Sequence, residues 1–202
     1  MPDRVNTAFK AVAKTFAANK TRPYDFRVKQ LRALIDNMKA KKKTLCEALT
    51  NDLGKSEFAN WTFEISMCIR DAEHTISHLK EWMKDEAVDT PFMVGPGRSA
   101  IMAEPLGVVA ILGAWNYPFV TTLMPFIAAV AAGNCCVIKP SEQATYSSKA
   151  IKSLLLTGVA SDCYKVIEGG IETGKRMTSL KFDQVIFTGS TQVGKLIAGA
   201  CA

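Results

Sequence analysis

The sequence predicts an α/β fold, in which a parallel, doubly wound sheet follows a set of N-terminal helices. Three observations support this prediction. Apolar residues recur at helical spacing before position 90, a loop rich in proline and glycine occupies 90–97, and short apolar runs alternate with helical segments from 98 onward. Strands that alternate with helices in this way form parallel sheets with helices on their faces.

The N-terminal part is predicted to contain two amphipathic helical regions. Pro23 suits the first turn of a helix, and apolar residues follow at helical spacing from Leu31 to Leu49. After a break at 51–54, a second apolar stripe runs from Trp61 to Met83. We expect this second stripe to pack in a core rather than to bind a ligand.

The sheet is predicted to lie in the second half of the chain. A short extended segment at 99–103 comes first and is followed by alternating strands and helices. The expected strands are 107–112, 135–139, 164–167 and 184–187, and the expected helices are 119–132, 144–156, 172–180 and one that opens near 193.

The longest uncharged stretch, from Pro105 to Ile138, has the hydropathy of a membrane span. It is interrupted by the segment 115–118, by Pro125 and by the pair Gly133 and Asn134. Parallel strands that are covered on both faces are also continuously apolar. We therefore predict buried strands and a buried helix here, and no membrane span.

The charge pattern gives no indication of a nucleic-acid partner. The formal charge of the 202 residues is +6, but the basic residues are dispersed. Their densest run, within 39–43, falls on a predicted helix and has no interleaved aromatic residues. That pattern is typical of a solvated helix face.

The cysteines and histidines predict neither a disulfide framework nor a metal site. The six cysteines contain no C-x-x-C pair, and His74 and His78 stand four residues apart without the glutamate of an H-E-x-x-H motif. No charged and then apolar signal segment opens the chain. We expect free thiols and a cytoplasmic location.

Ligands of a doubly wound, Rossmann-like sheet bind beyond the carboxyl ends of its strands. One predicted strand is followed by Gly189, Ser190 and Thr191, where a helix begins. Backbone amides and hydroxyls at a helix start suit an anion such as a pyrophosphate. Taken alone, this loop is explained equally well as a structural turn.

Lys139 and Glu142 come directly after another predicted strand, with Pro140 between them. A donor and an acceptor at this position can hold the two hydroxyls of a ribose. The carboxylate would also disfavour a 2′-phosphate, which favours NAD over NADP. An ordinary solvated loop is an equally good explanation of these residues alone.

Asn116 follows the first long strand and lies between Trp115 and Tyr117. A buried amide at this position needs hydrogen-bond partners, and one use for such a donor is to stabilise an oxyanion. The residue types alone favour another interpretation, in which Asn116 caps the helix that begins near Pro118.

Taken together, these segments resemble the aldehyde dehydrogenase family. The family's motifs occur in its order and at its spacing, and the form of 115–118 is most similar to the class 3 and fatty-aldehyde branch. The resemblance covers essentially the whole chain, and it rests on five segments: 104–109, 115–118, 132–134, 139–142 and 187–190.

The resemblance implies a set of roles. Asn116 would be a donor of the oxyanion hole, and Trp115 and Tyr117 would line the substrate site. Lys139 and Glu142 would hold the adenosine ribose of NAD, or alternatively of NADP, and Gly189, Ser190 and Thr191 would meet the pyrophosphate. The implied reaction is oxidation of an aldehyde to a carboxylic acid through attack by a cysteine thiolate.

The resemblance also implies that this chain stops before the catalytic domain. The family's general-base glutamate and its nucleophilic cysteine would come after Ala202, and none of the six cysteines matches the nucleophile's position. We therefore expect no aldehyde oxidation by this chain alone. The alternative function is a non-catalytic module for nucleotide binding or oligomer interaction.

The expected organisation has three parts. Residues 1–89 would form the N-terminal helical segment, 90–104 part of a small oligomerisation sheet, and 105–202 an incomplete NAD(P)-binding domain. The family forms homodimers or tetramers, so the resemblance implies a second copy as partner. Its fatty-aldehyde branch anchors to membranes through a C-terminal segment that would lie beyond this chain.

Overall fold

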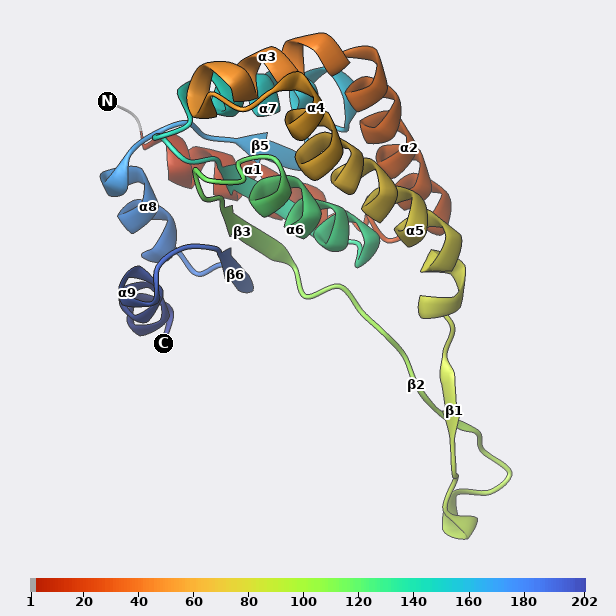
Figure 1. Ribbon diagram of the computed structural model, residues 1–202. Helices are drawn as coiled ribbons and strands as arrows, with labels where there is room; N and C mark the ends of the chain where they lie inside the picture. The colour runs from red at the N-terminus through yellow and green to blue at the C-terminus, as the bar shows by residue number, and fades with distance from the viewer. Residues whose placement is uncertain (1–2) are drawn as a thin grey trace.

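The central sheet of the computed structural model, which describes residues 3–202, is parallel throughout and has the strand order β5-β4-β3-β6. The chain enters the sheet at β3 in its interior, adds β4 and β5 on one side, and then crosses to place β6 on the other (Figure 1). The strands are β3 (Val108–Leu112), β4 (Cys135–Lys139), β5 (Tyr164–Val166) and β6 (Gln184–Phe187). The reversal of strand order lies between β3 and β6, and this is where doubly wound sheets bind ligands.

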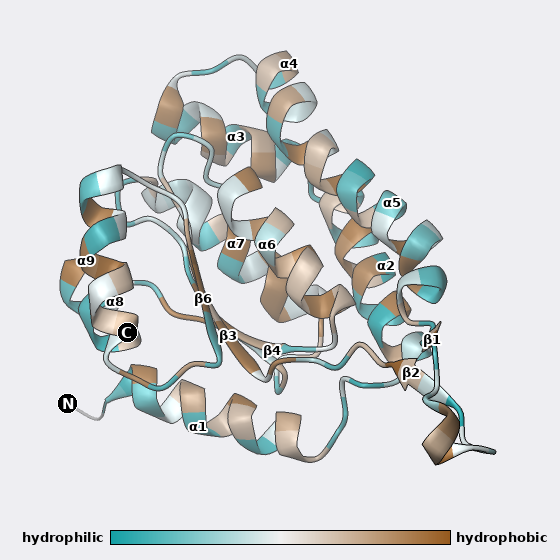
Figure 2. Cartoon of the chain, turned by 90° about the horizontal axis from the view of Figure 1, so that it is seen from below, coloured by the Kyte–Doolittle hydropathy of each residue, from teal (hydrophilic) through white to brown (hydrophobic). Residues whose placement is uncertain are grey.

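Helices cover both faces of the sheet, as the sequence predicted (Figure 2). On one face, α6 (Val120–Ala131) and α7 (Thr145–Gly158) pack on the strands and carry an outer layer of α2 (Tyr24–Ala40), α3 (Lys42–Leu53) and α5 (Ser66–Trp82). On the other face lie α1 (Arg4–Ala17) and α8 (Ile171–Thr178), and α8 contacts α9 (Thr191–Cys201). The sheet thus separates α1 from α2, α3 and α5, which follow it in the chain.

The uncharged stretch forms the core. Every residue of β3 and β4 is buried. Phe119, Leu123 and Phe126 are fully buried where α6 packs between α5 and the sheet. Among the described residues, no helix combines the length and the apolar character that crossing a membrane requires. The prediction of buried strands around a buried helix is confirmed.

Pro125 does not end the helix around it, which agrees with the predicted helix 119–132 but not with its inclusion among the interruptions of the apolar stretch. The residue lies inside α6, which continues to Ala131. A proline in a helix interior removes one backbone hydrogen bond. Most of a helix's stability in a protein comes from packing, and α6 is packed between the sheet and α5.

Residues from two of the five segments on which the resemblance rests, 104–109 and 132–134, help to hold the N-terminal ends of the strands. The Asn134 side chain accepts a hydrogen bond from the Gly107 amide at 2.9 Å, and Asp183 accepts one from the Val108 amide at 2.7 Å. Gly107 has φ +143°, and a Cβ there would collide with the Asp183 carboxylate. These residues align β3, β4 and β6 at the end of the sheet opposite to the predicted ligand loops.

A hairpin projects away from the layered part of the molecule (Figure 1). Its strands β1 (Glu86–Val88) and β2 (Ser99–Ile101) pair in antiparallel fashion, and a short 3-10 turn (Phe92–Val94) lies at its tip. The sequence analysis foresaw only the second strand. Phe92 is 97% exposed and Met93 is 91% exposed, so the tip presents apolar side chains to its surroundings.

The second amphipathic region is interrupted by a wider turn. A short helix α4 (Glu57–Asn60) continues into a π-helical segment, Trp61–Ile65, before α5 begins. A π-helical turn inserts one extra residue into a helix and is frequent at functional sites. The periodicity of the apolar residues did not reveal it.

Candidate functional site

The ends of three neighbouring strands coincide at one edge of the sheet. Leu112 is in register with Lys139 on one side and with Phe187 on the other. The pairing extends one residue beyond the strands, because the Gly113 amide donates to the Lys139 carbonyl at 3.0 Å and the Thr188 amide donates to the Leu112 carbonyl at 3.3 Å. The loops that carry the predicted site residues therefore leave the same edge.

Lys139 and Glu142 form an ion pair at this edge. The Lys139 ammonium lies 2.6 Å from the Glu142 carboxylate and also donates to the Pro140 carbonyl at 3.3 Å. The lysine side chain is 7% exposed and the glutamate side chain is 39% exposed. Partial burial acts to raise the pKa of Glu142, but the hydrogen bond and charge of Lys139 outweigh it and leave that pKa below its ordinary value. The carboxylate is therefore ionised and accessible.

The helix after this loop is held by a carboxylate from another element. The Asp52 side chain, near the end of α3, accepts hydrogen bonds from the Tyr146 amide at 3.1 Å and from the Ser147 amide at 2.6 Å. It thus satisfies two free amides in the first turn of α7. The sequence analysis missed Asp52, since a cap from a distant segment leaves no local pattern.

The loop after β6 has the features of an anion site. Ser190 caps α9, accepting a hydrogen bond from the Val193 amide at 3.3 Å, and Thr191 is the first helical residue. A Cβ at Gly189 would collide with the end of the Phe187 ring, so a larger residue there would require the ring to move. The Ser190 hydroxyl proton and the first amides of the helix remain available to a ligand.

The surroundings of this loop are open. None of the residues of α9 is buried, and Leu196 is 70% exposed. On the neighbouring helix α8, Ile171 is 71% exposed. Apolar side chains therefore stand beside the predicted pyrophosphate loop, a feature that the sequence analysis did not single out.

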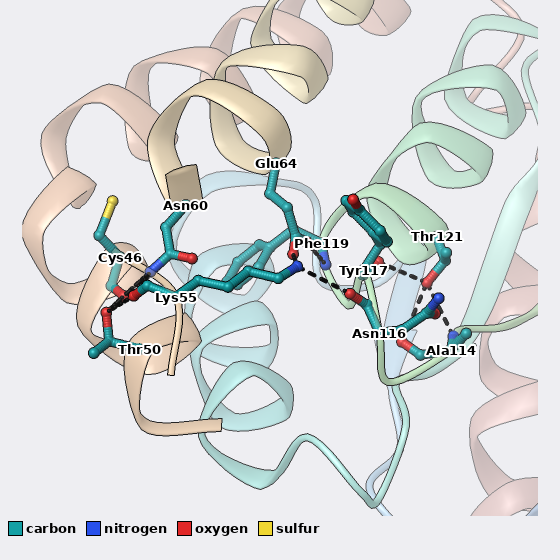
Figure 3. Close-up of polar contacts among 10 residues, drawn as sticks. All are labelled: Cys46, Thr50, Lys55, Asn60, Glu64, Ala114, Asn116, Tyr117, Phe119 and Thr121. Atoms are coloured by element: carbon teal, nitrogen blue, oxygen red, sulfur yellow. Dashed lines mark hydrogen bonds and ion pairs between the residues drawn. The ribbon is translucent and has the colours of Figure 1, made fainter. Parts of the chain in front are cut away.

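Asn116 is exposed and does not cap the following helix. Its side chain makes no hydrogen bond to the residues described, and α6 has no side-chain cap. Thr121 takes the structural role instead: its hydroxyl accepts from the Ala114 amide and donates to the Tyr117 carbonyl, both at 2.9 Å (Figure 3). The capping interpretation of Asn116 was wrong, as was the expectation that its amide is buried.

The segment around Asn116 is tied to the π-helical turn by two charged residues (Figure 3). The Glu64 carboxylate accepts from the Phe119 amide at 3.1 Å, and Lys55 donates to the Asn116 carbonyl at 3.2 Å. The two side chains approach each other to 3.4 Å. Neither residue was predicted from the sequence. The one available signal was the position of Glu64 within the apolar stripe from Trp61 to Met83.

The aromatic neighbours of Asn116 are partly exposed. Trp115 is 51% exposed and Tyr117 is 43% exposed, and the Lys55 ammonium lies 4.1 Å from the centre of the Tyr117 ring. Gly113, just before them, allows the close approach of α6, since a Cβ there would collide with the Thr122 hydroxyl.

Five of the cysteines are buried and Cys201 is exposed on α9. Burial raises the pKa of Cys68 and of Cys136 far above the ordinary range, and contact with Cys163 does the same for Cys135. Cys135 and Cys136 are therefore packed residues of the buried strand β4.

His74 and His78 lie on α5 with ring centres 4.1 Å apart, and His78 stacks on Trp82. Within residues 3–202 there is no group of three or more potential ligands that can hold a metal ion.

A family model described as the aldehyde dehydrogenase family matches residues 2–202. The chain belongs to the aldehyde dehydrogenase family. Similar proteins include aldehyde dehydrogenase family 3 member B2 of Mus musculus, at 38% identity over 95% of this chain and 40% of the relative. Another is a dimeric NADP-preferring aldehyde dehydrogenase of Canis lupus familiaris, at 38% identity over 98% of this chain and 44% of the relative.

Solved aldehyde dehydrogenases share the fold described above. A substrate-bound Staphylococcus aureus AldH superposes with a TM-score of 0.94 at 36% identity, covering 98% of this chain and 43% of its own. An NADP-dependent enzyme of E. coli gives a TM-score of 0.89 at 25% identity, over 98% of this chain and 41% of its own. The chain therefore spans about two fifths of the length of these similar proteins.

Proposed function

We propose that this chain is the N-terminal, cofactor-binding portion of an NAD(P)-dependent aldehyde dehydrogenase. The observation that carries the proposal is the shared edge of the sheet. There, the Lys139–Glu142 pair with its accessible carboxylate, the loop with Asn116 and the capped start of α9 follow three strands that end in register. In the family, a bound nicotinamide accepts a hydride from the reacting aldehyde.

The residues at this edge fit a dinucleotide. The Lys139 ammonium and the Glu142 carboxylate offer a donor and an acceptor to a pair of ribose hydroxyls. Gly189, Ser190 and Thr191 place backbone amides and a hydroxyl at the start of α9, where a pyrophosphate is stabilised. The accessible carboxylate of Glu142 favours NAD, although relatives are named NADP-preferring, so both cofactors belong in the test.

Asn116 is proposed as the donor that stabilises the oxyanion of the reacting aldehyde. Its amide is exposed beyond β3 and has no hydrogen-bond partner among the described residues, so it is free to donate to a developing negative charge. Trp115 and Tyr117 flank it as partly exposed rings and would line the aldehyde site.

The chain is proposed not to oxidise aldehydes by itself. Five of its thiols are buried, and the sixth, Cys201, is the last residue of α9. The nucleophile and the general base would come from residues outside 1–202. Steady production of NADH from an aldehyde by the purified chain would overturn this part of the proposal.

The decisive experiment is calorimetric titration of the chain with NAD and with NADP, using wild type and Glu142→Ala. Loss of a hydrogen bond to a charged group costs roughly 1.5–3 kcal/mol, so we expect saturable NAD binding that weakens at least about tenfold in the variant. Glu81→Ala is the matched control, because Glu81 forms a similar i,i+3 pair with Lys84 far along the exposed end of α5. Equal NAD affinity for wild type and Glu142→Ala would refute the assigned ribose site.

A second function, as an oligomer-interaction module, is favoured by the hairpin. Its apolar tip is among the most exposed parts of the molecule, and relatives are named dimeric. We propose that the hairpin contacts a second copy. Sedimentation of wild type against Phe92→Ser should show a shift toward monomer in the variant, whereas an unchanged distribution would count against this role.

A further inference from the structure

We propose that Glu64 and Lys55 act together as positioning residues, which hold the backbone on both sides of Asn116 so that its amide projects freely from the end of β3. This inference rests on the proposed role of Asn116 as the oxyanion donor. Neither residue touches the reacting atoms in this proposal, and each acts through the loop that it holds.

The burial of Glu64 is the first observation. Its side chain is 0% exposed, and a carboxylate withdrawn from water is costly unless it is paired and hydrogen-bonded. Both of its oxygens are engaged, one by Lys55 at 3.4 Å and the other by the Phe119 amide at 3.1 Å. An apolar side chain would fill this space at lower cost, so the carboxylate is explained by the backbone amide that it holds.

Lys55 connects the carboxylate to the loop. Its ammonium reaches the Glu64 carboxylate, the Asn116 carbonyl and the face of the Tyr117 ring (Figure 3). These three contacts converge on one charged group that is 32% exposed. A single lysine therefore fixes the carbonyl of Asn116 and the orientation of the neighbouring aromatic ring.

The backbone of Lys55 is itself held by hydrogen bonds. The Asn60 amide donates to the Lys55 carbonyl at 3.2 Å, to the Cys46 carbonyl at 3.1 Å and to the Thr50 hydroxyl at 2.9 Å. Asn60 is fully buried and directly precedes the π-helical turn that carries Glu64. The turn and the lysine are thus anchored to α3 rather than to the loop that they hold.

The result is a loop held at successive backbone positions. Lys55 holds the Asn116 carbonyl, Thr121 holds the Tyr117 carbonyl, and Glu64 holds the Phe119 amide. The Asn116 side chain itself makes no hydrogen bond to the residues described. A donor that is oriented in advance stabilises a developing charge without reorganisation.

The test is an NMR study of the isotope-labelled chain, which requires no cofactor. In Glu64→Ala and Lys55→Met, we expect exchange of the Phe119 amide, which donates to Glu64, to accelerate at least about fivefold, with protection of β3 and β4 unchanged. The Asn116 side-chain amide should become more mobile in both variants. Lys43→Met is the control, because Lys43 forms an exposed pair with Glu47 on α3.

The amide proton of Phe119 provides a readout that a general loss of stability would not imitate. Its chemical shift should follow the ionisation of Glu64, and Lys55→Met should move the midpoint to higher pH by removing the positive charge that faces the carboxylate. The Cys68 thiol, one turn along α5, is the other titratable group close to Glu64. Glu64→Gln should abolish this titration while keeping the Phe119 amide protected, since the amide oxygen still accepts its hydrogen bond.

The proposal is overturned if loop exchange in both variants equals that of Lys43→Met, or if exchange rises uniformly over all helices. It is also overturned if the Phe119 shift keeps its midpoint in Lys55→Met. Should Glu64→Ala fail to fold, Glu64→Gln and Lys55→Met still give both readouts. Because the measurement needs no ligand, failure of NAD binding would refute the proposed function and leave this result standing.

Discussion

Replacement of Asp52 by alanine should weaken the junction between α3 and α7. The carboxylate is the partner of the Tyr146 and Ser147 amides, and it stands next to the loop that carries the Lys139–Glu142 pair. Without it, two amides in the first turn of α7 lose their acceptor. The positive end of the helix dipole also loses a compensating charge.

The magnitude follows from these two effects. Loss of an N-terminal cap costs roughly 0.5–2 kcal/mol, and loss of a charge at a helix N-terminus costs roughly 0.3–1 kcal/mol. Because Asp52 is partly exposed, water replaces some of the lost hydrogen bonding. We expect the free energy of unfolding to fall by about 2 kcal/mol, which for a chain of this size lowers Tm by about 4–8 °C.

The assay is urea and thermal unfolding followed by circular dichroism. Asp36→Ala is the matched control, because Asp36 is an exposed aspartate on α2 that takes part in none of the ion pairs of the described residues. Asp52→Asn retains one acceptor and the helix cap but loses the charge, so its Tm should lie between wild type and Asp52→Ala. The reasoning is refuted if Asp52→Ala unfolds at the same urea concentration as Asp36→Ala.

Three further predictions concern the site and the core. Gly113→Ala should lower the free energy of unfolding by about 1–3 kcal/mol, because the added Cβ collides with the buried Thr122 hydroxyl. Gly174→Ala is the control and should not lower it, because a Cβ there meets nothing. Adding Thr122→Ala to Gly113→Ala should restore part of the loss, and strictly additive effects in the double mutant would contradict the collision. Burial raises the pKa of Glu64 above its ordinary 4.5, so the folded state binds more protons in that range. The stability of wild type relative to Glu64→Gln should therefore fall as pH rises from 4.5 through the raised pKa and level off above it, and a rise over this window in urea unfolding would show the sign to be wrong. A thiol reagent should modify Cys201 rapidly in the native chain and the other five cysteines only after denaturation, and rapid loss of more than one thiol would refute their burial.

Much of the fold was predictable because its causes are local. The alternation of apolar strands and helices gave β4 and β6 with their observed bounds, since both are short runs between turn residues. The order of the strands was not stated, because pairing between β3 and β6 depends on contacts across 75 residues, such as Asp183 with the Val108 amide. Pro125 does not end α6, as the predicted helix 119–132 implied, because burial on both sides overrides the usual effect of proline.

The candidate site also contains residues that local sequence patterns predict and residues that they do not. Lys139, Glu142 and Ser190 were found because strand ends and helix starts leave local patterns, and their placement on one edge follows from a parallel sheet. Asn116 was misjudged as a cap, because residue preferences do not reveal that Thr121 supplies the needed hydrogen bonds. Asp52, Lys55 and Glu64 reach the site from the N-terminal helices, and no sequence spacing shows such a contact.

The central claim is that this edge of the sheet binds a nicotinamide dinucleotide, and NMR titration of the labelled chain with NAD tests binding and location together. We expect saturable shifts of the backbone amides of Glu142, Ser190 and Thr191, with smaller shifts at Asn116 and none at the hairpin tip around Phe92. Saturable shifts confined to surfaces remote from these loops, or no shifts from a folded chain, would contradict the account.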